Sequence, residues 1–531
     1  MPIRQYLRSH SYIFRLRQQG FRVHGIEKSP SLGGVWYTNR YPGARADSPQ
    51  PYYQFFDEML IDGWTWSESF PEQSEILAYF EYVDSQWKIS QHYTFSTSVN
   101  AASWDSSSHQ WHVFLSDGRV LLTRWLVCAV GFASFSSLPN LPGLDRFQGK
   151  MCHTAEWPDK PIDWKNARVA VIGTGASATQ VIQELASQVQ HLTVYQRSPV
   201  VGLPKDENTD KTAWTDKKYA KKLVEASSTY HSAFPFSFRS ERTMDVPDNE
   251  RHTLYSRLLK EGNWSFLLST FEDSLYDLKA NSDMYSFWAE RMRERIDDPR
   301  LKDLLIPLKP TYPIGIKRPC LQSGYYEVFN QDNVELVDVS TMPIVEITEN
   351  GIQDARAHRA FDYIIWATGF EARTNTLTRI NIQGKNSITL KSAWSQGVRS
   401  HLGLATHGFP NLFYLYGPQS ATVRVNAPAV IQAQVDWLSN TLISLRSLSK
   451  TSCEATKEAE TAWREKVANP WYQTLYPSAK SWETRGNNET CDEPAWYKNY
   501  TPIYKSTALT FTGSRDYQLI SMNWKCVRHQ H

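Results

Sequence analysis

Continuous apolar runs, separated by glycine turns and helix-period segments, predict a parallel α/β fold. The clearest run is residues 168–172 (RVAVI), whose β-branched side chains are typical of a strand buried on both faces. A glycine turn, a helix-period segment and a second apolar run follow, so residues 168–196 predict one strand–turn–helix–strand unit. By the same rules, further strands are predicted at 109–117, 124–132, 334–339, 361–370 and 408–416, and a long helix at 428–448.

The N-terminal stretch resembles the end of a second unit of this kind. Tyr12, Ile13 and Leu16 recur at helical spacing before Gly20, and a short strand is predicted at 22–26. The first 26 residues contain no acid and several arginines, which leaves a transit peptide as the alternative. Because the helix runs directly into a strand, we favour the helix of a βαβ unit.

Glu27 ends this predicted strand. In a dinucleotide-binding unit, an acid at this place holds the ribose hydroxyls about 20 residues after a glycine-rich phosphate loop. Here the first glycine of the chain is Gly20. We therefore expect the first strand and the GxGxxG turn of this unit to be missing. Three explanations are open. The start of the sequence is wrongly assigned, the chain is a relative that has lost cofactor binding, or another strand takes the place of the first one.

Composition and charge narrow the function classes. In 531 residues, 57 Lys and Arg balance 55 Asp and Glu, so no charged surface is expected to recruit nucleic acid. Six cysteines without CxxC spacing predict a reducing, cytoplasmic location and argue against a disulfide oxidoreductase. No apolar run approaches the roughly 18 residues that span a bilayer. No residue pattern predicts a metal site.

The turn after residues 168–172 carries a phosphate-binding pattern. Gly173, Gly175 and Ala178 match GxGxxG/A: a tight turn, a close backbone approach to a pyrophosphate, and close packing of helix on strand. The second strand is followed by Arg197 rather than an acid. Because an arginine suits a 2′-phosphate, we predict NADP rather than NAD. A purely structural βαβ unit is the alternative.

Two longer motifs carry a family resemblance. Residues 147–159 read F-x-G-x-x-x-H-x-x-x-W-P-D, and residues 33–47 read G-G-x-W-x-x-x-x-Y-P-G-x-x-x-D. On these residues the chain resembles the Baeyer–Villiger monooxygenases. The stretches at 312–339, 364–370, 408–420 and 474–482 also follow patterns of that family, so the likeness covers roughly residues 12–482. Sister flavin monooxygenases that oxidise nitrogen or sulfur usually lack the Trp-Pro pair, here Trp157 and Pro158, so ketone chemistry is favoured.

The resemblance implies an α/β fold with two Rossmann-like dinucleotide-binding domains, for FAD and NADP, and a helical insertion. It also implies that NADPH reduces FAD, that the reduced flavin takes up O2, and that the resulting peroxide attacks a ketone to give an ester or lactone. The implied domains are 1–150 (FAD-binding, first part), 151–205 (NADP-binding, first part), 206–307 (helical insertion), 308–372 (NADP-binding, second part), 373–482 (FAD-binding, second part) and 483–531 (a divergent tail with little expected regular structure).

Site residues follow from the same resemblance. Arg318 takes the place of the family's active-site arginine, whose fixed charge stabilises the peroxide anion without protonating it. Asp47 would hold Arg318 and lie against the flavin, Lys317 would lie beside the 2′-phosphate, and His153 would link the domains. The other expected cofactor contacts are Glu27 on the FAD ribose; Val35, Trp36, Tyr37, Thr38, Ser48 and Tyr53 around the flavin; Arg45 and Ala46 towards the nicotinamide; Thr174, Gly175, Ala176, Ser177, Ala178, Thr179 and Gln180 on the pyrophosphate; and Arg197 and Ser198 on the 2′-phosphate.

Some expectations concern the surroundings of the site. Trp64 and Trp66 are expected in the core, and the substrate pocket between the helical insertion and the loop after Tyr416. After Trp482 the chain departs from the family pattern that closes a loop over the cofactors. The alternatives to ketone oxygenation are nitrogen or sulfur oxygenation, and a non-catalytic NADP-binding relative that has lost FAD.

Overall fold

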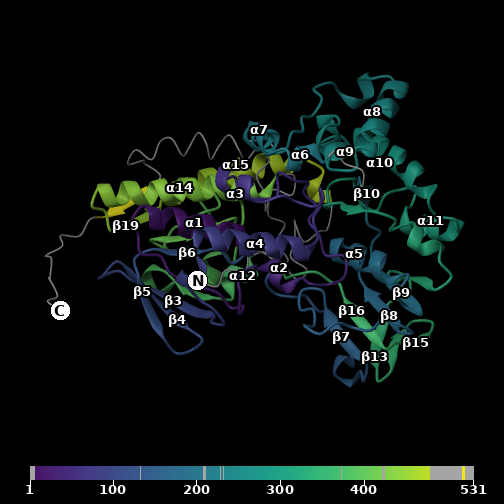
Figure 1. Cartoon of the computed structure of the whole chain (residues 1–531), viewed down its shortest axis with the longest axis horizontal. Coiled ribbons are helices and arrows are strands. Elements are labelled where there is room, and N and C mark those ends of the chain that lie inside the picture. The colour runs from purple at the N-terminus through teal and green to yellow at the C-terminus, as the bar shows by residue number, and fades with distance from the viewer. Residues whose placement is uncertain are drawn as a thin grey trace.

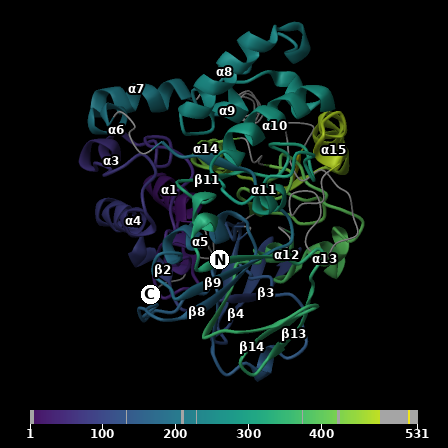
Figure 2. The same cartoon turned by 90° about the vertical axis from the view of Figure 1, so that its right-hand side faces the viewer.

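The computed structural model describes residues 6–131, 133–206, 211–227, 229–230, 232–371, 374–420, 425–478 and 517–520. Two α/β regions lie side by side in Figure 1, and a helical region lies beside the second of them. The first region contains the strands between residues 25 and 128 and the strand at 412–414, and the second contains the parallel strands at 150–196 and 334–366. The same helical region lies at one end of the molecule in Figure 2.

The second α/β region is built on a parallel sheet whose strand order, in the described residues, is β12-β9-β8-β16-β7. Its strands are β7 (Lys150–His153), β8 (Arg168–Ile172), β9 (His191–Gln196), β12 (Val334–Asp338) and β16 (Tyr363–Trp366). Helix α5 (Ala176–Leu185) follows β8 and precedes β9. The strand–turn–helix–strand unit predicted at 168–196 is therefore confirmed.

Both faces of this sheet are covered, since successive side chains of a strand point to opposite faces. Val169 and Val171 pack with Ile182 of α5. Ala170 and Ile172 pack in a different cluster, against a three-stranded antiparallel sheet. That sheet consists of β13 (Ile344–Thr348), β14 (Gly351–Asp354) and β15 (His358–Ala360).

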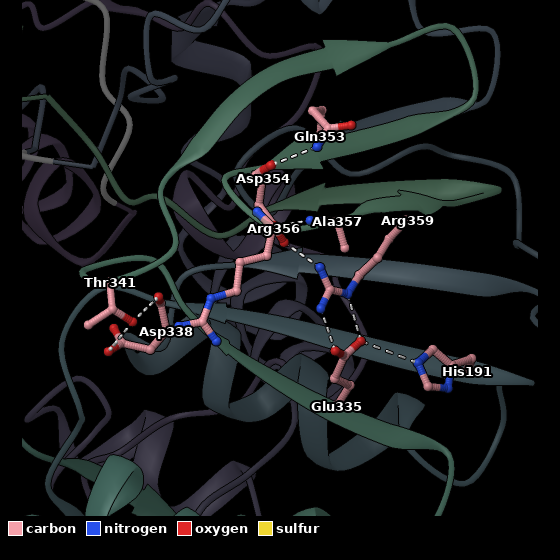
Figure 3. A network of polar contacts seen from close by, with 9 residues as sticks. All are labelled: His191, Glu335, Asp338, Thr341, Gln353, Asp354, Arg356, Ala357 and Arg359. Atoms are coloured by element: carbon pink, nitrogen blue, oxygen red, sulfur yellow. Dashed lines mark hydrogen bonds and ion pairs between the residues drawn. The ribbon is translucent and has the colours of Figure 1, made fainter.

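A network of charged side chains ties the antiparallel sheet to the edge strand β12 (Figure 3). Arg359 on β15 donates from Nε and Nη2 to the two carboxylate oxygens of Glu335 on β12, at 2.8 and 2.6 Å, and it also pairs with the buried Asp354. His191 lies 3.8 Å from Glu335. The hydrogen bonds with Glu335 raise the pKa of Arg359. We assign the network a structural role because its charges pair with each other across the two sheets.

The first α/β region contains two separate pairs of parallel strands in the described residues. Strand β1 (Gly25–Ile26) pairs with β2 (Tyr93–Thr94), and β6 (Leu126–Cys128) pairs with β18 (Leu412–Tyr414). Ile26, Leu126 and Leu412 nevertheless belong to one hydrophobic cluster, so both pairs flank the same core. The strand predicted at 22–26 is shorter than expected because only Gly25 and Ile26 pair with a neighbour. The missing first strand and GxGxxG turn stay a prediction.

Helices and an antiparallel sheet complete this region. Helix α1 (Tyr6–Gln18) packs on α14 (Ala427–Ser447), and the predicted helix before Gly20 is thereby confirmed. Trp64 and Trp66 lie in or against the same core, as predicted. The remaining elements are α2 (Val35–Thr38), α3 (Glu58–Gly63), α4 (Gln73–Trp87), β3 (Val99–Asp105), β4 (Gln110–Leu115), β5 (Val120–Thr123), α12 (Asn375–Thr378), β17 (Asn381–Gln383), α13 (Leu390–Ala393), β19 (Ser452–Ala455) and α15 (Lys457–Tyr472).

The insertion predicted between 206 and 307 consists mainly of helices joined by turns in its described residues. Its elements are α6 (Thr212–Thr215), α7 (Lys217–Ser227), α8 (Asp248–Lys260), α9 (Ser265–Leu268), α10 (Leu278–Arg293) and α11 (Pro299–Leu305), and the short parallel pair β10 (Gly202–Pro204) and β11 (Cys320–Gln322) lies at its base. Tyr255 and Trp288 are buried in the cluster that also contains Val169, so the insertion shares a core with the second region. The domain boundaries themselves stay predictions.

One short strand is described in the C-terminal tail. Within 483–531 the structure describes only residues 517–520, which form β20 (Tyr517–Ile520) and pair antiparallel with β19. The expectation of little regular structure in the rest of the tail stays a prediction. The loop that departs from the family pattern after Trp482 lies outside the described residues. No helix among the described residues is long and apolar enough to cross a bilayer.

Candidate active site

Asp47 and Arg318, which are far apart in sequence, form an ion pair between the two α/β regions. Arg318 Nε and Nη2 each lie 2.8 Å from Asp47 Oδ2. Their side chains are 28% and 36% exposed, so the pair is partly shielded and still open to a ligand. Arg318 stands just before β11, and Asp47 ends the motif at 33–47. The structure thus brings together the two residues expected to share a catalytic role.

Trp264 joins this pair from the helical insertion. Its indole ring centre lies 4.5 Å from Cζ of Arg318, within the range of a cation–π contact. Its Nε1–H donates to the backbone carbonyl of Asp47. Sequence reasoning missed Trp264 because a single tryptophan in a helical segment carries no motif; only the folded chain places it beside Arg318.

An apolar pocket opens beside Arg318. It is lined by Phe234, Trp264, Leu267, Leu268, Gly315, Arg318 and Pro319. Phe234, Leu267 and Leu268 come from the helical insertion, and that this pocket receives the substrate stays a prediction. The described part of the loop after Tyr416 lines a different hollow, at the carboxyl ends of β6 and β18, together with Cys128 and Leu377. That place is where nucleotides bind in parallel sheets.

The glycine turn after β8 has the shape of a phosphate cradle. Gly173 has a φ of +113°, and a Cβ there would lie 2.6 Å from the Ala367 carbonyl oxygen. A Cβ on Gly175 would meet nothing within 4 Å. Gly175 is the N-cap residue of α5, so no side chain at this position covers the first amides of the helix. These features fit a pyrophosphate, which helix N-termini bind through backbone N–H groups.

The predicted pyrophosphate residues divide into two groups. Ala176 and Ser177 lie in the first turn of α5, where their amides can reach a ligand. Thr179 does not fit a direct contact: its side chain is fully buried and its amide donates to the Gly175 carbonyl. Ala178 is also fully buried, as its packing role requires.

The residues expected to contact the 2′-phosphate lie after β9 and before β11. Arg197 is exposed there, and Thr174 Oγ1 donates to the Ser198 carbonyl at 2.8 Å. Lys317 approaches from the other side: its Nζ lies 4.2 Å from the ring centre of Tyr312, and Tyr312 donates to the Pro199 carbonyl. Arg197 and Lys317 lie on two segments that Tyr312 connects, and their two positive charges fit a phosphate group.

The residues expected around the flavin lie near β1 and α2. Glu27 is buried, and its Oε1 accepts from the Ser29 amide at 2.7 Å. Trp36 Nε1 donates to Tyr53 Oη at 2.9 Å, with the two rings edge to face. A carboxylate that can accept from ribose hydroxyls, next to aromatic rings, fits a flavin nucleotide. The other expected flavin residues in this neighbourhood are Val35, Tyr37, Thr38, Ala46 and Ser48, of which Ala46 and Ser48 are buried.

Tyr41, Arg45 and Gln180 connect the two regions. Tyr41 donates to Gln180 Oε1 at 2.9 Å, and Gln180 Nε2 donates to the Arg45 carbonyl at 3.3 Å. Burial raises the pKa of Tyr41 to about 12, so its hydroxyl stays a donor at neutral pH. The Arg45 guanidinium pairs with Glu68 and Glu72, at 3.2 and 2.8 Å. In this conformation Arg45 and Gln180 serve the contact between the regions rather than a ligand.

The motif at 147–159 contacts the motif at 33–47. Arg40 Nη2 lies 2.5 Å from Asp159 Oδ1 in an exposed ion pair. His153, at the end of β7, is buried, its Nδ1 accepts from the Ala155 amide at 3.0 Å, and burial lowers its pKa. A neutral, buried ring is consistent with the expected linking role of His153.

The cysteines in the described residues are free, and burial raises the pKa of Cys320 to about 12, which keeps its thiol protonated.

Comparison with known proteins shows which family this chain belongs to. A family model described as flavin-binding monooxygenase-like matches residues 21–203. Among curated relatives, the FAD-binding monooxygenase lolF2 of Epichloe uncinata is 41% identical over 91% of this chain and 90% of its own length. Cyclopentanone 1,2-monooxygenase of a Comamonas strain is 36% identical over 90% of this chain and 87% of its own length.

Solved structures extend the likeness to the whole fold. The cyclohexanone monooxygenase of Rhodococcus sp. Phi1, bound to NADP+, superposes with a TM-score of 0.93 at 32% identity and 98% coverage of both chains. OTEMO in complex with FAD and NADP gives the same TM-score, identity and coverage. An oxidised steroid monooxygenase bound to NADP gives a TM-score of 0.91 at 35% identity, over 98% of both chains.

Proposed function

This chain belongs to the Baeyer–Villiger monooxygenases, and we propose that it inserts one oxygen atom of O2 next to a ketone carbonyl, giving an ester or lactone. It is a flavoprotein monooxygenase that uses FAD and NADPH. The observation that supports the ketone reaction best is the Asp47–Arg318 pair beside an apolar pocket. That arrangement offers a fixed positive charge where an uncharged substrate would lie.

The residues of the chain bind and orient the cofactors. When bound, FAD that NADPH has reduced supplies the activated oxygen. The buried Glu27 would accept from the FAD ribose, and Gly175 with the start of α5 would hold the NADP pyrophosphate. Arg197 and Lys317 would balance the charge of the 2′-phosphate.

Arg318 performs the electrostatic part of the reaction in this proposal. Its guanidinium stays charged at any relevant pH, so it stabilises negative charge on oxygen without giving up a proton. Asp47 keeps that guanidinium at the mouth of the pocket. Leu267 and Leu268 exclude water from the pocket and receive the apolar body of the ketone.

Product analysis tests the proposed function. The purified chain is supplied with FAD, NADPH and either a hydrophobic cyclic ketone or a thioether, and products are identified by mass spectrometry. We expect lactone from the ketone, with NADPH consumed in proportion. A sulfoxide without lactone would instead indicate sulfur oxygenation. A colourless chain that binds NADPH and forms neither product would indicate a non-catalytic relative.

Arg197 provides a sharper test of nucleotide choice. We expect Arg197→Ala to raise the KM for NADPH by roughly tenfold to a hundredfold, because a charge-assisted contact with the 2′-phosphate is lost. The KM for NADH, which lacks that phosphate, should stay unchanged. Arg300→Ala is the matched control, since Arg300 is 89% exposed in the insertion. Equal losses with both nucleotides would contradict the assignment.

A further inference from the structure

We propose that Trp264, from the helical insertion, is a positioning residue that holds the Arg318 guanidinium at the angle that oxygen transfer requires. The inference rests on the proposed function. Trp264 would support Arg318 from outside the motifs at 33–47 and 147–159. The helical insertion would then contribute to the reaction as well as line the pocket.

The contact with Asp47 holds Arg318 at a single carboxylate oxygen. Both guanidinium contacts, from Nε and from Nη2, end on the same carboxylate oxygen, Oδ2. The other oxygen, Oδ1, lies 3.5 Å from Ser48 Oγ. A fork that engages both carboxylate oxygens fixes the plane of a guanidinium, whereas a contact with one oxygen lets that plane pivot. A flat surface against the guanidinium would limit this pivoting.

Trp264 supplies that surface and holds both partners of the pair. Its ring lies under the guanidinium, 4.5 Å from Cζ, which restricts the pivot. Its indole N–H donates to the Asp47 carbonyl, which fixes the backbone that carries the carboxylate. Trp264 is itself only 4% exposed. The Leu267 and Leu268 amides donate to its carbonyl, at 3.1 and 3.0 Å, so α9 anchors it.

Trp288 offers a matched comparison within the insertion. It is fully buried in the same cluster, and its Nε1 also donates to a backbone carbonyl, that of Gly202, at 3.0 Å. Substituting Trp288 by Phe removes an indole N–H of the same kind at a site assigned no part in orienting Arg318. A purely structural effect would therefore appear in both variants.

The first test uses the cofactor-free chain, so it does not depend on flavin binding. Phenylglyoxal modifies accessible guanidinium groups, and peptide mass spectrometry gives the labelling rate of Arg318. We expect Trp264→Leu to label about tenfold faster than the parent, because both the ring and the N–H are lost. Trp264→Phe keeps a ring and should fall between them. Parental labelling of Arg318 in both Trp264 variants would overturn the proposal.

The second test uses the enzyme loaded with FAD and NADPH. We expect the amount of ester formed per NADPH oxidised to fall about tenfold in Trp264→Leu and less in Trp264→Phe, with hydrogen peroxide formed in place of the missing ester. The KM for NADPH should stay unchanged. Equal losses in Trp288→Phe would overturn the positioning role. A parent enzyme that forms no ester would instead contradict the proposed function, while the labelling result would stand by itself.

Discussion

Arg318→Ala is expected to abolish ester formation while NADPH oxidation remains measurable. The variant removes the fixed charge at the pocket mouth, and the loss of one such stabilising group slows the reaction by about 10²- to 10³-fold or more. NADPH oxidation depends on the nucleotide cradle around Gly175 and α5, which this substitution leaves intact. The measurement is the amount of ester, determined by gas chromatography, divided by the amount of NADPH oxidised. A ratio near zero with continued NADPH oxidation is the expected result.

Two companion variants make that result specific. Arg318→Lys keeps a positive charge but loses the planar fork that contacts Asp47, so an intermediate ester yield is expected. Arg300→Ala removes an exposed arginine and should match the parent. Full ester yield in Arg318→Ala would contradict the proposed role of Arg318.

Gly175→Val is expected to leave the fold unchanged and to weaken NADPH binding by about 100-fold or more, because several charge-assisted backbone contacts are lost. The backbone at Gly175 has a φ of −73°, which any residue adopts, and a Cβ there meets nothing within 4 Å. The added side chain would therefore occupy only the space that the pyrophosphate needs. Calorimetric titration with NADPH and a thermal unfolding curve measure the two effects.

Gly173→Ala should show the opposite behaviour. The backbone at Gly173 has a φ of +113°, and an added Cβ would lie 2.6 Å from the Ala367 carbonyl oxygen, so any side chain strains the fold. A loss of about 1–3 kcal/mol in the free energy of unfolding is expected. If Gly175→Val were destabilised as much as Gly173→Ala, the open space at Gly175 would not be a ligand site.

Sequence patterns succeeded where local structure follows from neighbouring residues. The run at 168–172 forms β8 with the predicted bounds, since a buried central strand requires continuous β-branched side chains. The strand at 22–26 was overestimated, because its length depends on partner strands that lie far away in sequence. Strand β20 was missed for the same reason, because its partner β19 lies far away in sequence.

In the site, too, sequence patterns identified local features better than contacts between distant segments. Family motifs singled out Asp47 and Arg318 separately, and the structure shows that they touch. No motif contains Trp264, and only the folded chain places its ring against Arg318. Thr179 followed the phosphate motif by position, but its place in α5 turns its side chain into the core. Sequence spacing therefore identified the glycine turn better than the individual contacts around it.

The position of Trp264 has a consequence for attempts to change which ketones are accepted. Trp264, Leu267 and Leu268 line the pocket, and the first of them also touches Arg318. Exchanging this segment for that of a homologue would change which ketones fit the pocket. It would also change the amount of ester formed per NADPH oxidised. Redesign of selectivity should therefore retain the indole at 264 and vary Leu267 and Leu268 first.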